Sequence, residues 1–353
     1  MALVSHTTVG PQTELEDTVI VEAFGSRKCS KLIEQVQSDK PTLRRNALSV
    51  LCNEMHNPVS VQGCCEAGMV EILNTYISNS DDSSTRERAS KALAIASIDA
   101  IGRRSMLESG SASKVAAALD DTNVTVRSNV YEALVNFAKG PLPCLRAIIA
   151  AKYASVLVAK VANEVPSVQP LVLRLLYSCI KDDSGLDDAL GASAVDTCIG
   201  LLEPKNSDDI KKEAATTLGF LCFADTAKVE AIKGGAVEAL SLLLAKGQAG
   251  MVQAAAAGAM MAVTTTDDAK KLILGAEGVP CLVDLLVDST PPQRLLRLNV
   301  LKTIANVAVN PKVRSLLRAS PIALPMLCDL EEGDDVLVTK HAAVAKAAVL
   351  WEP

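Results

Sequence analysis

The sequence predicts an all-α protein in which short helices stack as a solenoid of about eight repeats. Hydrophobic residues make up 49% of the 353 residues and aromatic residues only 3%. A core built mainly from Ala, Leu, Val and Ile favours helices over a β-sandwich or barrel. Apolar segments also recur about every 42 residues, with polar or Gly-containing breaks between them. Self-similarity at this period is typical of helical repeats.

The last helix of each predicted repeat carries the clearest pattern. Large apolar residues recur at steps of 41 to 44, and each is preceded four residues earlier by Ala or Val. Residues four apart lie on one helix face, where small side chains let a neighbouring helix pack closely. The large row is Leu51, Leu93, Leu134, Leu176, Leu218, Met260, Ile304 and Ala347. The small row is Ala47, Ala89, Val130, Val172, Ala214, Ala256, Val300 and Ala343.

An earlier helix is predicted in each repeat. Gly-containing breaks such as Ala67-Gly68 and Glu277-Gly278 precede it, and joints rich in Ser, Asp and Asn follow it. Such polar residues can cap the next helix. The row of the earlier helix is Leu32, Leu73, Val115, Leu157, Cys198, Leu240, Leu282 and either Leu324 or Leu327.

Two or three helices in about 42 residues are typical of armadillo or HEAT repeats. The Gly-initiated earlier helix and the long last helix rich in small residues favour an armadillo-type right-handed superhelical solenoid, with HEAT as the alternative. One repeat cannot bury its apolar face alone, so stacking must supply the core. We expect a polar N-terminal arm at residues 1–23, the solenoid at 24–350 and a short tail at 351–353.

Charge and hydropathy argue against several classes of partner. The net charge is −6 and the pI about 5.3, so we expect neither nucleic acid nor an anionic membrane as a partner. No apolar stretch follows a basic region at the N-terminus, and the apolar segment 249–263 is shorter than the roughly 20 residues that a membrane span needs. Ten cysteines without a signal peptide indicate a reducing compartment.

The sequence gives no support for catalysis. None of the three histidines lies in an H-E-x-x-H pattern, and G-x-S-x-G, P-loop, dinucleotide and C-x-x-C motifs are absent. We therefore expect no enzyme activity, cofactor, metal or small-molecule substrate. The cysteines in predicted helices are expected to act as small buried hydrophobes.

A third row lies seven residues before the large row and contains six cations and two glutamines. We expect these side chains near the starts of the last helices, along an edge that borders the concave groove. Two interpretations remain open: the row binds an acidic segment of a partner, or it pairs locally with Asp residues of the joints. The row is Arg44, Arg86, Arg127, Gln169, Lys211, Gln253, Arg297 and Lys340.

Three asparagines lie two residues after the large row, at Asn53, Asn136 and Asn306. They can hydrogen-bond the backbone of an extended peptide, although a mixed surface without a ligand is the alternative. Nuclear-import armadillo proteins pair a regular Asn array with Trp residues. This chain has a single Trp, Trp351, which argues against recognition of a nuclear signal.

The first repeat resembles that of a particular family. The stretch Phe24-Gly25-Ser26-Arg27-Lys28 leads into Leu32, and Arg45-Asn46-Ala47-Leu48 is followed by Leu51-Cys52-Asn53-Glu54-Met55-His56-Asn57-Pro58. These segments are similar to the opening repeat of the radial spoke head protein fourteen family, the armadillo proteins of ciliary radial spokes. Arg297-Leu298-Asn299 and the tail ending in Pro353 also resemble that family.

The resemblance implies a non-enzymatic structural subunit of the axonemal radial spoke in a cilium or flagellum. It implies contact with other spoke proteins, including the elongated spoke scaffold protein of the stalk or neck, and a role in the regulation of motility. The alternative is a cytosolic or nuclear armadillo adaptor that captures an acidic extended peptide of a cargo protein.

Overall fold

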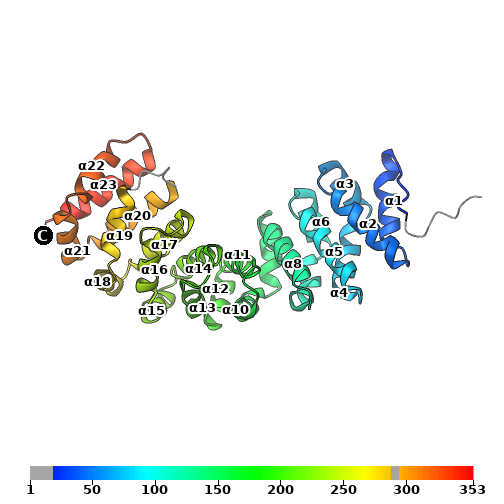
Figure 1. Ribbon diagram of the computed structural model, residues 1–353, viewed down its shortest axis with the longest axis horizontal. Helices are drawn as coiled ribbons and strands as arrows, with labels where there is room; N and C mark the ends of the chain where they lie inside the picture. The colour runs from blue at the N-terminus through cyan, green and yellow to red at the C-terminus, as the bar shows by residue number, and fades with distance from the viewer. Residues whose placement is uncertain (1–18, 288–293, 353) are drawn as a thin grey trace, which may run out of the picture. The chain divides into compact units, whose positions relative to one another are not determined.

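The computed structural model describes residues 19–287 and 294–352, and within these ranges the chain consists of helices joined by turns, without a strand (Figure 1). The predicted all-α solenoid of repeats is confirmed. Eight last helices recur along it: α2 (Pro41–Glu54), α5 (Ser83–Ala96), α8 (Val124–Ala138), α11 (Gln169–Cys179), α14 (Asp208–Leu221), α17 (Gly250–Val263), α20 (Arg294–Val307) and α23 (Val336–Leu350).

Each last helix follows a second helix. The second helices are α1 (Lys28–Val36), α4 (Met69–Asn79), α7 (Ser111–Lys114) with η2 (Ala116–Asp120), α10 (Tyr153–Asn163), α13 (Ala194–Leu201), α16 (Ala236–Leu244), α19 (Gly278–Val287) and α22 (Ala323–Glu331). Repeats two to eight open with a first helix: α3 (Pro58–Glu66), α6 (Ala100–Glu108), α9 (Leu142–Ala150), α12 (Asp183–Gly191), α15 (Asp225–Lys233), α18 (Asp267–Gly275) and α21 (Pro311–Ala319).

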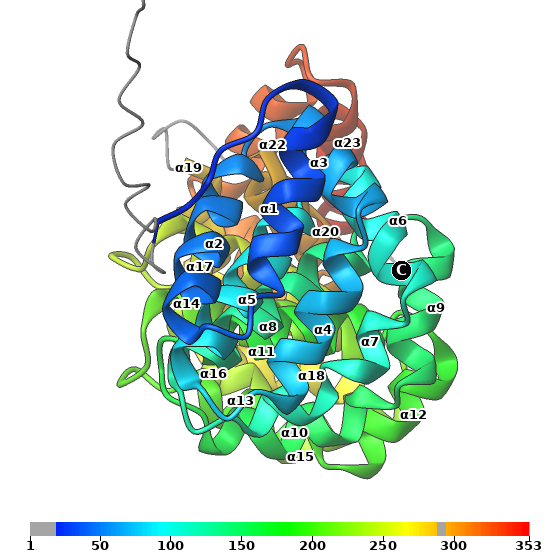
Figure 2. The same cartoon turned by 90° about the vertical axis from the view of Figure 1, so that its right-hand side faces the viewer.

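The helices form two compact units, residues 1–151 and 152–353. In the first unit, α1 packs against α2, and the described chain before α1 runs past α2 (Figure 2). A short 3-10 helix, η1 (Gly25–Arg27), leads directly into α1. Residues 1–18 of the predicted arm lie outside the described residues. The boundaries 1–23, 24–350 and 351–353 and the right-handed course of the array stay predictions.

The core lies where the predicted rows place it in seven of the eight repeats. Every member of the large row from Leu51 to Ile304 is fully buried, and so is every member of the small row from Ala47 to Val300. Successive last helices pack on one another within each unit. The approach is closest in the second unit, where a Cβ added to Gly219 of α14 would lie 3.0 Å from the Cα of Ala259 in α17.

The predicted register is wrong in the eighth repeat. Ala347 is exposed, whereas Ala342, Ala345 and Val349 of α23 are buried. The buried counterpart of Ile304 is therefore Ala345, two residues before the predicted position. So many residues of α23 are Ala or Val that small side chains alone do not mark its inner face. In the earlier row, the fully buried Leu327 completes the pattern, while Leu324 is only half-buried.

The breaks before the second helices share one backbone feature. A residue with positive φ recurs at the same place in repeats two to seven, and it is glycine only at Gly68, Gly110 and Gly235. The other three repeats place Lys152, Ser193 and Glu277 there. The predicted break at Glu277-Gly278 thus has its left-handed residue at Glu277. The following Gly278 has another role, because an added Cβ would come within 2.5 Å of Cγ1 of Ile273.

Candidate protein-interaction surface

The cationic row lies at the starts of the last helices, where three arginines bind the backbone in the same way. Arg44 donates from Nε to the carbonyl of Ser38 at 3.0 Å, Arg86 from Nη1 to that of Ser80 at 2.9 Å, and Arg127 from Nη1 to that of Asp121 at 2.6 Å. Each acceptor lies six residues earlier, just after the second helix. Carbonyls at a helix end lack intrahelical partners, and a cation there also opposes the negative end of the helix dipole.

The two glutamines of the row make an equivalent contact without a charge. Gln169 donates from Nε2 to the carbonyl of Val161 at 2.8 Å, and Gln253 does so to that of Ala245 at 3.0 Å. The position therefore requires a hydrogen-bond donor and not specifically a cation. This requirement explains why the row mixes Arg with Gln.

The remaining members of the row differ. Lys211 pairs with Asp208 at 2.8 Å, and its side chain is largely buried. Arg297 is half-buried and Lys340 exposed. The corrected register of the last repeat places Val338, and not Lys340, at the position of the row. Six members thus already hold the joints or the helix starts together; contact of the row with a partner stays a prediction.

One local pair involves a charged partner from the next repeat. Arg86 Nε lies 2.6 Å from Asp121 Oδ2, and both side chains are mostly buried. Burial alone would raise the pKa of Asp121. The hydrogen bonds from Arg86 and from the backbone N–H of Asn123 outweigh that effect and hold this pKa below its ordinary value.

The three asparagines do not form a common array. Asn53 is exposed on α2, and Asn136 accepts a hydrogen bond from Nζ of Lys139 at 3.1 Å. Asn306 donates from Nδ2 to the carbonyl of Met261 at 3.0 Å, which joins α20 to α17. Their predicted contact with an extended peptide stays untested, and Asn306 has a structural partner.

The last helices differ in charge from the rest of the chain. Together they carry fourteen Lys or Arg and six Asp or Glu, although the whole chain has a net charge of −6. The last helices, with their buried and exposed faces counted together, are therefore net basic within an acidic protein. Such a distribution favours a partner with negative charge on these helices, because local charges act only over about one Debye length, roughly 8 Å at physiological salt.

The structure reveals a cluster of aromatic residues on α11, on α14 and just after α14 that the sequence analysis did not predict. The rings of Tyr177 and Phe220 meet edge to face with centroids 5.4 Å apart, and those of Phe220 and Phe223 do so at 5.5 Å. Nζ of Lys181 lies 4.6 Å from the centroid of the Tyr177 ring. We call these four residues the aromatic ridge. Three of the nine Phe, Trp and Tyr residues of the chain lie in it. This concentration of scarce aromatic residues is the sequence feature from which the cluster could have been predicted.

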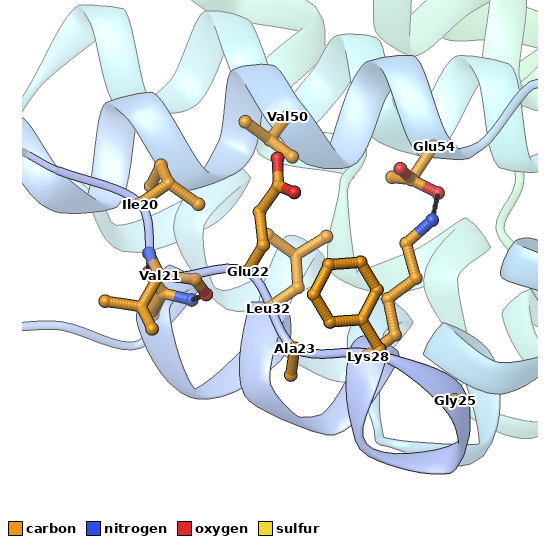
Figure 3. A pocket seen from close by; sticks show the side chains of 11 residues that line it. Ile20, Val21, Glu22, Ala23, Gly25, Lys28, Leu32, Val50 and Glu54 are labelled. Atoms are coloured by element: carbon orange, nitrogen blue, oxygen red, sulfur yellow. Dashed lines mark hydrogen bonds and ion pairs between the residues drawn. The ribbon is translucent and has the colours of Figure 1, made fainter.

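A hollow of about 160 Å³ lies at the N-terminal end of the first unit, between residues 20–25 and helices α1 and α2 (Figure 3). The amide of Gln35 holds the extended segment there by accepting from the N–H of Val21 at 2.8 Å and donating to its carbonyl at 2.9 Å. Lys28 and Glu54 pair at 2.6 Å at the other end of the hollow. These contacts secure the chain on the first repeat.

The buried thiols are poorly suited to nucleophilic or redox chemistry. All ten cysteines are free and six are buried. Burial raises the pKa of Cys52 to about 11 and that of Cys222 to about 12, so both remain protonated near neutral pH. Among the described residues, no group of three or more His, Cys, Asp or Glu side chains is placed to hold a metal ion.

No single helix in residues 19–287 and 294–352 is long and apolar enough to cross a membrane; only α9 and α10 together, across a sharp bend, reach that length and composition.

Comparison with known proteins identifies a protein of similar sequence. No family model matches the chain. It is 27% identical over 340 residues to radial spoke protein 14 of Chlamydomonas reinhardtii, an alignment that covers 93% of this chain and 87% of that protein. The chain is therefore similar to radial spoke protein 14 over most of its length. The similarity thus extends well beyond the first repeat, over 93% of the chain.

Solved structures support the armadillo type of stacking. The crystal structure of an engineered protein matches with a TM-score of 0.80 and 26% identity, over 91% of this chain and 78% of that one. A designed armadillo repeat protein matches with a TM-score of 0.60 and 20% identity, over 67% of this chain and 99% of its own. The chain therefore has an armadillo-type fold.

Proposed function

We propose that the chain is a non-enzymatic structural subunit of the axonemal radial spoke, which binds other spoke proteins and supports the regulation of ciliary motility. The observation that carries the proposal is the match to radial spoke protein 14 over 93% of the chain. That match runs along the repeats themselves, so the shared role belongs to the helical array.

The physics of repeat stacking suits such a role. Each repeat contacts only its neighbours, which leaves a long surface along one side of the array. An exposed ion pair contributes only about 0 to 1 kcal/mol. A partner that follows several repeats can add many weak contacts, whereas a compact partner reaches few of them. The elongated spoke scaffold protein of the stalk or neck has the shape that this surface requires.

Restoration in cells with motile cilia tests the proposal. A tagged copy of the chain, expressed in cells that lack their own, should lie along the axoneme and co-purify with spoke proteins after the axoneme is extracted. Axonemes that lack radial spokes are the matched control, and the tagged chain should be absent from them. Retention of the chain in spokeless axonemes would contradict the proposal.

A further inference from the structure

The aromatic ridge has the features of an interaction anchor. Phe223, just after α14, is 65% exposed, while Tyr177 and Phe220 are half-buried beneath it. The edge-to-face contacts place the ring of Phe220 between those of Tyr177 and Phe223. Rigid, partly exposed aromatic side chains lose little conformational entropy on binding and are enriched among the residues that dominate interface affinity.

The ridge is confined to one place in the array. At the register positions of Phe220 and Phe223, no other repeat has an aromatic residue. The counterparts of Phe220 are Asn53, Ile95, Asn136, Ser178, Ala262, Asn306 and Ala347. Those of Phe223 are His56, Ile98, Lys139, Lys181, Thr265, Val309 and Leu350. A packing requirement shared by all repeats therefore does not explain these two rings.

The charges around the ridge select the sign of the partner. Arg174 and Lys212 lie on the same two helices, one and two turns before the rings, and Lys181 covers Tyr177. The nearest carboxylate on these helices, Glu213, already accepts from Arg174 at 2.8 Å and from Lys212 at 2.9 Å, and its side chain is only 10% exposed. Arg174 and Lys212 thus share one carboxylate, and Lys181 lies over the Tyr177 ring. Of the carboxylates that follow the ridge residues in sequence, Asp182 caps α12 by accepting from Ser184 and Asp225 pairs with Lys228.

The neighbouring helix does not offset this charge. Helix α17 packs against α14 and carries no charged residue. Its partly exposed positions Ala255, Gly258 and Met261 provide an apolar surface next to the ridge. A ligand that crosses from α11 to α17 therefore meets cations and rings on α11 and α14, and then an uncharged surface on α17.

We propose that the aromatic ridge docks a segment of a partner protein in which carboxylates stand beside a large apolar side chain. The apolar side chain of the partner packs on Phe220 and Phe223. Its carboxylates pair with Lys181 and with those N–H groups of Arg174 and Lys212 that do not bind Glu213. This inference rests on the proposed scaffold function, because it specifies where one spoke partner is held and by what chemistry.

Binding of synthetic peptides to the purified full-length chain tests the chemistry. Three labelled peptides of equal length are compared by fluorescence anisotropy: one with glutamates flanking leucine and phenylalanine, one with serine replacing those apolar residues, and one with lysine replacing the glutamates. The first should bind about tenfold more tightly than the other two. If the lysine peptide bound as tightly as the first peptide, the proposed negative charge of the partner would be wrong. If the serine peptide bound as tightly as the first, the proposed role of the aromatic rings would be wrong.

Matched variants locate the site. Phe223→Ala and Lys181→Glu should each weaken binding of the first peptide about tenfold. The controls are Phe24→Ala, another exposed Phe, and Lys139→Glu, the register counterpart of Lys181; both should bind as the unchanged chain does. Equal affinity of Phe223→Ala and the unchanged chain would overturn the proposal. So would self-association that Phe223→Ala abolishes, because the ridge would then hold a second copy.

A crosslinking experiment in axonemes separates this inference from the proposed function. A photoreactive benzoyl group is placed on the ring of residue 223 or, as the control, of residue 24, in chains restored to ciliated cells. We expect residue 223 to crosslink to an acidic, apolar segment of a spoke protein. If the chain enters spokes but residue 223 forms no such crosslink, the proposed docking at the ridge is wrong and the spoke assignment is unaffected. Failure to enter spokes overturns the spoke assignment, and the peptide measurements then decide on the ridge alone.

Discussion

Arg86 and Asp121 connect two successive repeats through a mostly buried ion pair, with Nε 2.6 Å from Oδ2 and side chains 16% and 6% exposed. The same guanidinium also binds the carbonyl of Ser80. One residue therefore fixes the joint of its own repeat and the joint of the next. Arg86, one of the cations proposed from sequence as a partner contact, thus has structural partners in two repeats.

Removal of Arg86 is expected to destabilise the first unit. Arg86→Ala leaves the carboxylate of Asp121 largely buried without its partner, and breaking such a pair costs about 3 kcal/mol. Arg104→Ala is the matched control, because Arg104 pairs with Glu108 in an exposed position and its loss should change stability by less than about 1 kcal/mol. Urea unfolding followed by circular dichroism measures both. Equal midpoints for the two variants would show that the buried pair is not a source of stability.

The same pair predicts a dependence on pH. Because the folded state holds the pKa of Asp121 below its unfolded value of about 3.9, the unfolded state binds more protons in that range. The stabilisation is present above about pH 4 and is lost as the pH falls through the lower folded value. Thermal melting is compared at about pH 5 and about pH 3, on either side of the ordinary pKa of Asp. Asp121→Asn should lose less stability between these two pH values than the unchanged chain does. An identical loss in both proteins would contradict this assignment.

Two glycines in helices predict effects of opposite sign. Gly219→Ala places a Cβ 3.0 Å from the backbone of Ala259, so α14 and α17 must separate, at a cost of roughly 1 to 3 kcal/mol. Gly200 in α13 has no atom within 4 Å of an added Cβ. Gly200→Ala should raise stability by up to about 1 kcal/mol through higher helix propensity. Thermal melting distinguishes them, and destabilisation by both would mean that the packing of α14 on α17 is not the cause.

The left-handed break positions can be tested in both directions. Glu277 has φ of 53° and Gly235 has φ of 80° at corresponding places. Glu277→Gly should raise the free energy of unfolding by roughly 0.5 to 1 kcal/mol, because glycine adopts positive φ without steric strain. Gly235→Ala should lower it by roughly 1 kcal/mol for the same reason. Chemical unfolding of the two variants measures the pair, and a loss of stability for Glu277→Gly would contradict the account of the breaks.

Gln253 tests whether the row needs donors or positive charge. Gln253→Leu removes the donor to the carbonyl of Ala245 in a buried position and should cost about 1 to 3 kcal/mol. Gln253→Arg keeps a donor and should cost less than Gln253→Leu. Thermal melting ranks the two variants. If arginine proved as damaging as leucine, the donor role of this position would be refuted.

The fold was predictable because its signal repeats. Seven members of the large row are buried as expected, since a period near 42 residues averages over local irregularities. The prediction failed in α23, where Ala342, Ala343, Ala345, Ala347 and Ala348 are interchangeable by residue type. Only the packing of α23 on α20 determines which of them face inward.

The candidate surface was less predictable because residue type does not reveal which partner a side chain has. A cation that recurs in each repeat gives the same sequence pattern whether it binds a ligand or a backbone carbonyl. Arg44 and Arg127 bind carbonyls of their own joints. The aromatic ridge is the opposite case. It combines residues from different register rows, and Tyr177 and Phe220 meet only when α11 and α14 are side by side.

The most direct test of the scaffold assignment is electron cryo-microscopy of radial spokes isolated from ciliated cells with and without this chain. We predict that the difference between the two maps is a stack of helices, two or three to each repeat, that lies against an elongated partner. Spokes with identical density in the two preparations would contradict it.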